Sequence, residues 1–134
     1  MNRTLRAAAA AIALTAMPSP AHHAFSAEYD ANRCVTISGT ATRIEWSNPH
    51  VWLSVEASDE LGQPIKWSIE MGSPGGLLRR GWSKTALREG DHVVVEGYGA
   101  KDGRKVLNAR TVTLPDGRKL FGGFQSTPGA PVRR

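Results

Sequence analysis

Residues 35–71 read VTISGTATRIEWSNPHVWLSVEASDELGQPIKWSIEM, and this stretch decides the fold. Apolar and polar residues alternate along it in three runs, which is the period of a strand with one buried face. The middle run is the clearest, because Val51, Leu53 and Val55 fall on one side. Residues that favour turns separate the runs. The sequence therefore predicts three antiparallel strands joined as a meander.

The first run changes phase partway along its length. Every second residue from Val35 to Ala41 is apolar or small, whereas the next apolar residues are Ile44 and Trp46. The change occurs near Gly39, and a glycine inside a strand often marks a bulge. We therefore expect a bulged and sharply bent first strand.

Beyond the meander, Ser73 and Pro74 are a capping residue and a first helical residue, and they predict a short helix that stops at Gly81. Two further strands are expected near 93–97 and 106–114. The predicted fold is all-β, a five-stranded OB-fold-like barrel with one short helix between strands 3 and 4. A plain β-sandwich is the alternative, but it would need about seven strands.

The first 21 residues have the pattern of a cleavable signal peptide. Two arginines precede an apolar run at 7–16, and a small-residue cleavage mark ends at Ala21. A membrane anchor is the alternative, and it would need an apolar run of roughly 20 residues. We therefore expect a periplasmic or secreted protein that begins at His22 and has no membrane span after cleavage.

One domain is expected after the signal peptide of residues 1–21. Residues 22–34 have no regular period and are predicted to form an extended N-terminal arm, with Phe25 and Tyr29 as anchors onto the domain. Residues 35–124 are predicted to form the OB-like β-barrel domain. The tail, 125–134, is rich in proline and glycine and is expected to be disordered.

The charge of the chain argues against one class of partner. Removal of the signal peptide takes away two arginines and no acid, so the net charge falls from +5 to +3. Residues 22–70 carry −4 and residues 71–134 carry +7. An acidic half would suit a cation and a basic half an anionic surface. A charge of +3 is weak for phosphate binding, so nucleic acid is not an expected partner.

Known catalytic motifs are missing from the sequence. It contains no Gly-x-Ser-x-Gly, no phosphate-binding loop and no Cys–His pair at nucleophile spacing. Cys34 is the only cysteine, so no internal disulfide can form. No hydrolase is supported, and a binding or carrier role is favoured over catalysis.

The strongest chemical feature is a candidate metal site made of His22, His23 and His50. Cleavage after Ala21 would leave His22 with a free α-amine, and this amine and the imidazole can close a chelate ring on one metal. His50 is predicted to point outward, where the arm could meet it, with Glu70 as a carboxylate neighbour. The open, nitrogen-rich set resembles the histidine brace of copper proteins. Nitrogen ligands favour copper, with zinc and nickel as rivals.

A second hypothesis is a binding module for a peptide, a glycan or an envelope protein. Trp46 and Trp52 would stack on the ligand if both were exposed on the barrel face, and Glu70 lies on the same face. These three residues are the alternative ligand-binding site. A redox enzyme built on the same copper nitrogens is a third alternative, although no substrate groove can be identified from the sequence. His92, at a strand start, is expected to be an ordinary surface residue.

The chain also resembles a known family. It contains His22-His23-Ala24-Phe25, a His-His-x-Phe motif, and Asn48-Pro49-His50 inside the segment 45–52. Together with Ser73-Pro74, Gly81-Trp82, Gly90-Asp91 and Lys101-Asp102-Gly103, these motifs resemble a family of small exported bacterial proteins of unknown function. The resemblance implies export and a single domain, and it assigns no catalytic residue.

Overall fold

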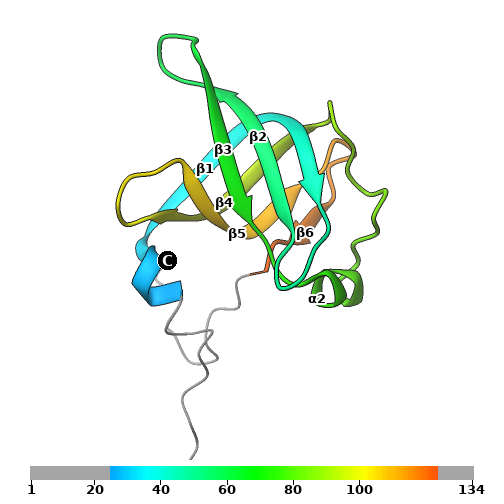
Figure 1. Ribbon diagram of the computed structural model, residues 1–134. Coiled ribbons are helices and arrows are strands. Elements are labelled where there is room, and N and C mark those ends of the chain that lie inside the picture. Colours follow the sequence, from blue (N-terminus) through cyan, green and yellow to red (C-terminus); the bar gives the residue numbers. More distant parts are fainter. Residues whose placement is uncertain (1–24, 124–134) are drawn as a thin grey trace, which may run out of the picture.

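The protein is described by a computed structural model that covers residues 25–123 (Figure 1). The predicted signal peptide, the histidines at 22 and 23 and the predicted tail lie outside these residues. A helical turn at 25–28, called here the N-terminal turn, comes first. The elements that follow are β1 (Tyr29–Glu45), β2 (Trp52–Ser58), β3 (Pro64–Glu70), α2 (Pro74–Arg79), β4 (His92–Ala100), β5 (Val106–Thr113) and β6 (Lys119–Phe121).

The strands form one sheet in the order β3-β2-β1-β4-β5-β6, and β3 also pairs with β5. The β3–β5 pairing is parallel, and all the other pairings are antiparallel. The all-β class and the helix between β3 and β4 confirm the prediction. The count of five strands was wrong, because the turn at Pro115–Gly117 returns the chain into a short sixth strand that pairs with the end of β5.

The first strand is longer than expected. It begins at Tyr29, six residues before Val35, because residues of the predicted arm pair with β4. Tyr29 lies opposite Ala100, and an irregularity follows before Cys34 pairs with Tyr98. The arm therefore belongs in part to the sheet.

The predicted bulge in the first strand is confirmed. The register of β1 with β2 shifts between Ala41 and Arg43. Before the shift Gly39 is buried against β2, where an added Cβ would lie 2.3 Å from the backbone oxygen of Glu56. Only glycine permits this close approach of two strands. The bend lets β1 pair with β2 over its second half and with β4 over its first half.

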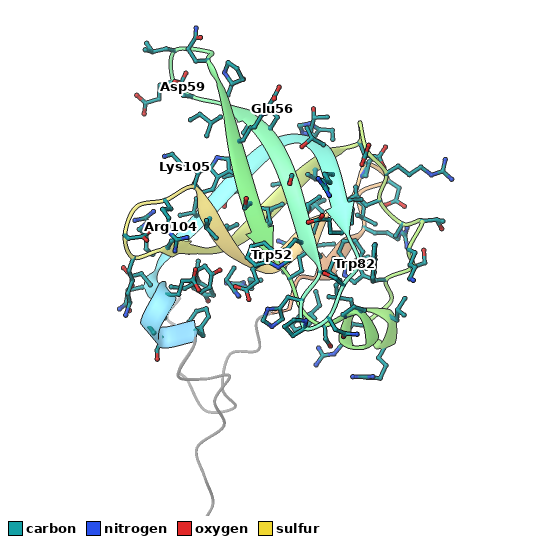
Figure 2. The ribbon with its side chains drawn as sticks, in the orientation of Figure 1. Trp52, Glu56, Asp59, Trp82, Arg104 and Lys105 are labelled. Carbon is teal, nitrogen blue, oxygen red and sulfur yellow. The ribbon has the colours of Figure 1, made fainter. Side chains whose placement is uncertain are left out.

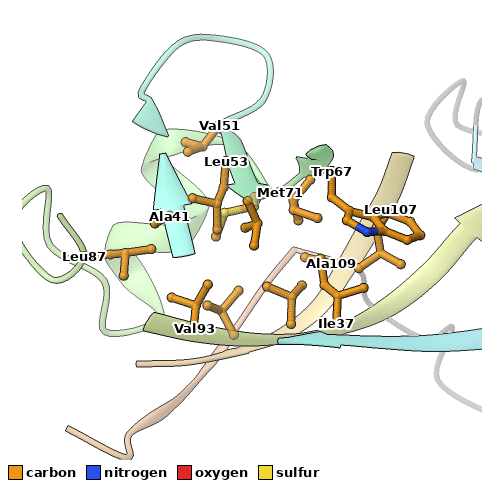
Figure 3. Close-up of a cluster of buried hydrophobic side chains, with 14 of the residues drawn as sticks. Ile37, Ala41, Val51, Leu53, Trp67, Met71, Leu87, Val93, Leu107 and Ala109 are labelled. Carbon is orange, nitrogen blue, oxygen red and sulfur yellow. The ribbon is translucent and has the colours of Figure 1, made fainter. Parts of the chain in front are cut away.

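The core is filled by the apolar faces that the alternation predicted (Figure 3). Val51, Leu53 and Val55 are fully buried, and Ile69 lies opposite Leu53 in the register of β2 and β3. Leu107 of β5 is buried with them. Along each strand, every second residue counted from these buried ones points into the core, and the residues between them point to the outer face.

The short helix α2 closes one end of this core. Ser73 caps it, since its Oγ accepts from the backbone N–H of Gly76 at 3.1 Å, and Pro74 occupies the first turn, as predicted. Leu77 is the helical residue buried in the core. Within residues 25–123, no helix is long and apolar enough to cross a membrane.

Gly39→Ala is expected to destabilise the protein by at least about 1–3 kcal/mol, because the new methyl group would overlap the backbone of β2. Urea unfolding of the purified variant measures the change. Gly75→Ala is the matched control: it lies in α2, where the nearest atom is the end of the flexible Arg79 side chain at 3.3 Å. Alanine there should be neutral or stabilise by about 0.5–1 kcal/mol. Equal unfolding curves for the two variants would contradict the assigned strand contact.

Candidate functional site

A partly buried carboxylate, Glu70, is the centre of the candidate site. Its side chain is only 12% exposed, and one oxygen, Oε1, lies 2.5 Å from Nδ1 of His50. The other oxygen, Oε2, accepts from the Tyr29 hydroxyl at 2.5 Å and from Nδ2 of Asn108 at 3.4 Å. Tyr29, His50, Glu70 and Asn108 are called here the Glu70 cluster. They join β1, the β1–β2 connection, β3 and β5.

Strand alternation explains why Glu70 faces away from the core. Its neighbour Ile69 is fully buried inside, so Glu70 points to the outer face. The register places Glu70 opposite Trp52 of β2 on one side and Asn108 of β5 on the other. The carboxylate is therefore flanked by both neighbouring strands at the junction of β3 and β5.

Tyr29 covers this carboxylate from the N-terminal side. Its side chain is 2% exposed. Burial, and then the hydrogen bond to Glu70 and the negative charge of Glu70, raise the pKa of the Tyr29 phenol far above its usual range. The phenol therefore stays protonated at neutral pH and acts as a hydrogen-bond donor to Glu70.

His50 is held in the loop that leads into β2. Its carbonyl accepts from Ser47 Oγ at 3.3 Å, and the next residue, Val51, exchanges two backbone hydrogen bonds with residues 71 and 72. Lone pairs on Nδ1 and the Glu70 oxygen would repel at 2.5 Å, so a proton must lie between the two atoms. A neutral imidazole with its proton on Nδ1 keeps a lone pair on Nε2. The side chain is 44% exposed, so this second nitrogen can meet a ligand.

The N-terminal turn packs directly on the Glu70 cluster. The Phe25 ring stacks on Tyr29 with the centroids 5.6 Å apart, and it meets the Tyr98 ring edge-on at 5.9 Å. The prediction that Phe25 and Tyr29 anchor the arm is confirmed. A chain of three side-chain contacts thus leads from Phe25 through Tyr29 and Glu70 to His50.

The loop between β4 and β5, residues 101–105, holds the turn from the other side. The backbone N–H of Lys101 donates to the Glu28 carbonyl at 2.9 Å, and its ammonium donates to the Ser26 carbonyl at 2.5 Å. Arg104 pairs with the Glu28 carboxylate at 3.1 Å and lies on the side of the molecule that carries the N-terminal turn (Figure 2). The position of residue 25 is therefore fixed by both packing and hydrogen bonds.

Asn108 contributes a polar atom that the residues of 25–123 leave unsatisfied. Its Nδ2 faces Glu70, whereas its Oδ1 is buried and accepts no hydrogen bond from any described residue. An amide flip would turn the oxygen toward the carboxylate, so the observed orientation is the favourable one. The sequence analysis missed Asn108. Its signal was an amide between two apolar residues of a strand, Leu107 and Ala109.

The structure brings together three of the residues singled out in the sequence and separates a fourth. His50, Trp52 and Glu70 share the outer face, and Trp52 lies near the start of β2 (Figure 2). Trp46 instead packs against the core, with its ring 6.5 Å from that of Trp82. The two tryptophans therefore do not form one stacking surface. His92, expected at the surface, contacts Ser38 through Nε2 at 3.0 Å on an exposed part of the sheet.

The cluster places the His50 imidazole against the partly buried Glu70 carboxylate, which orients it. Such a pair can bind a cation through Nε2 or exchange a proton with a bound group. The described residues contain no group of three or more His, Cys, Asp and Glu side chains that could hold a metal ion. A metal bound by His50 would therefore take its other ligands from outside residues 25–123.

Comparison with protein families identifies a match for this chain. The model of a family of unknown function, DUF6152, matches residues 9–108. That range includes all four residues of the Glu70 cluster. None of the curated proteins matches the chain. The match spans most of the sequence, so the chain belongs to this family of unknown function.

Proposed function

We propose that this is an exported, periplasmic metal-binding protein that carries or buffers copper. The observation that carries the proposal is the contact between Nδ1 of His50 and the partly buried Glu70 carboxylate. In metal sites, a ligating histidine almost always gives its other ring N–H to a carboxylate or a carbonyl, and this fixes the tautomer and raises the basicity of the free nitrogen. His50 has this arrangement before any ion binds.

His22 and His23 supply the remaining ligands in this proposal. His22 lies three positions before Phe25, so the two Cα atoms lie at most about 11 Å apart. Phe25 itself is docked on Tyr29, whose hydroxyl touches the same carboxylate as His50. This short connection supports the proposal that the N-terminal histidines reach His50.

The donor set favours copper over other ions. Cleavage after Ala21 supplies an α-amine and an imidazole on His22, and His50 adds a second imidazole. Such nitrogen donors suit copper, which also has the highest affinity in the divalent series. Zinc and nickel are the competing ions. An exposed site without a closed cage of ligands fits a carrier better than a permanent structural metal.

We further propose that the sheet is an OB-type barrel. Its support is the circuit of strand pairs β1–β2–β3–β5–β4–β1, together with α2 between β3 and β4. In this arrangement the site lies on the outside of the barrel, where β3 and β5 meet. Strands held in a closed circuit provide a rigid support for His50 and Glu70.

Copper titration tests the metal site. The mature protein that begins at His22 should bind Cu(II) with one tight site, and His50→Ala or His22→Ala should weaken it by at least about tenfold because each removes a nitrogen ligand. Isothermal calorimetry and the copper d–d absorption give the affinity and the ligand set. His92→Ala is the matched control and should bind as the parent does, since His92 contacts Ser38 elsewhere on the sheet.

A separate measurement tests whether cleavage exposes His22, independently of the site at His50. Mass spectrometry of the exported protein should give a chain that starts at His22. Equal, weak binding by the parent, His22→Ala and His50→Ala would refute the copper site.

Glu70→Gln tests the role of the carboxylate. It keeps the size of the side chain but removes its charge, so copper affinity should fall by about 10–100-fold although every ligand remains. Circular dichroism of the variant distinguishes this effect from simple loss of structure. Unchanged affinity in a folded Glu70→Gln protein would show that the carboxylate does not support a ligand.

A binding module for a glycan or peptide is the second candidate, and a groove on another part of the surface favours it. The groove has a volume of about 390 Å³, in the size range of small-ligand sites. It lies across β1, β2 and β3, and hydroxyl and charged side chains dominate its lining. The lining residues are Thr42, Arg43, Ser54, Glu56, Lys66, Trp67 and Ser68.

Filling this groove tests the second candidate. Ser54→Tyr would place a ring over the floor of the groove and should abolish binding of envelope glycan fragments, measured by calorimetry, while copper binding is retained. Glycan binding that survives Ser54→Tyr would exclude this groove as the ligand site.

A further inference from the structure

The segment from α2 to the start of β4 carries a concentration of positive charge. Residues 74–88, called here the cationic segment, contain four basic side chains and no acidic one; the four are Arg79, Arg80, Lys84 and Arg88. Glu89 and Asp91 follow only after its end. Its first part, α2, lies at the opposite end of the sheet from the β2–β3 turn, and the rest of the segment runs from there along one side of the molecule toward the start of β4 (Figure 1).

Three apolar anchors fix the orientation of the cationic segment. Leu77, Trp82 and Leu87 are buried in the core, spaced five residues apart. The indole N–H of Trp82 also donates to the Phe121 carbonyl at 2.8 Å. The four basic side chains of the segment are all exposed. The segment therefore keeps its positive charges in solvent while its anchors hold it on the core.

Some of the other described cations form ion pairs, and in this they differ from the cations of the segment. Arg43, Arg104, Arg118 and Lys119 each pair with a nearby carboxylate. None of the four cations of the cationic segment forms an ion pair within residues 25–123. Arg80 lies over the Phe121 ring at 4.4 Å, a contact that leaves its charge uncompensated. The positive charge is thus available to an external partner.

An exposed leucine accompanies these cations. Leu78 is 46% exposed and is one of two large apolar side chains that are exposed among the described residues. It lies directly before Arg79 and Arg80 in the sequence. A leucine beside several cations suits the boundary between lipid headgroups and acyl chains, where apolar and cationic groups are both stabilised.

We propose that the cationic segment docks the protein onto a membrane surface that contains anionic phospholipids. Charge complementarity supports this partner, because the four cations of the segment are exposed and none of them forms an ion pair within residues 25–123. Guanidinium and ammonium groups bind phosphate oxygens, and Leu78 would insert between headgroups. The docking is peripheral and reversible, and it does not depend on copper or on the Glu70 cluster.

Binding to vesicles tests the proposal. The purified mature protein should cosediment with vesicles of phosphatidylglycerol and phosphatidylcholine at low salt, and not with phosphatidylcholine alone. Arg79→Gln/Lys84→Gln should weaken this binding by about 30-fold, since each cation near an anionic membrane contributes about fivefold. Arg80 is left in place because it packs on Phe121.

A matched control removes the same charge elsewhere. Arg33→Gln/Lys66→Gln also lowers the net charge by two, and both residues are exposed on other strands. This control should retain most of the binding. Equal losses in the two double variants, or equal binding to neutral vesicles, would overturn the docking surface. Inorganic polyphosphate distinguishes the lipid from free phosphate: if it binds as tightly as the vesicles and Leu78→Ser has no effect on vesicle binding, the membrane is not the partner.

Discussion

The contacts made by the partly buried carboxylate of Glu70 are the interaction on which the arrangement of the outer surface depends. A carboxylate taken out of water is costly unless hydrogen-bond donors surround it. Here the donors come from three other parts of the chain, namely Tyr29, His50 and Asn108. The need to compensate one negative charge therefore holds the N-terminal region, the β1–β2 connection and β5 in fixed positions around β3.

The sheet makes this convergence possible. The pairing of β3 with β5 brings Glu70 and Asn108 side by side, although they lie 38 residues apart in the sequence. The bulge after Ala41 and the close contact at Gly39 let β1 form backbone pairings with both β2 and β4. The core fixes the strands, the strands fix the carboxylate, and the carboxylate orients the imidazole.

The two proposals use opposite halves of the charge distribution. The acidic half contains Glu70, which supports the proposed cation site, whereas the basic half contains the cationic segment, which is the proposed contact with anionic phosphate. A carrier held at a membrane surface could exchange its ion with membrane-bound partners while its metal site stays exposed.

The sequence alone determined which faces of the strands are buried and where the helix begins. Val51, Leu53 and Val55 alternate with polar residues, and Ser73 caps the helix; both signals are local, so they can be identified without knowing the fold. Only the tertiary structure decided that Tyr29 and Asn108 meet at Glu70, that Trp46 turns away from Trp52, and that the chain adds a sixth strand. Alternation assigns a residue to a face but does not say which strands become neighbours, and that choice depends on contacts between residues far apart in the chain.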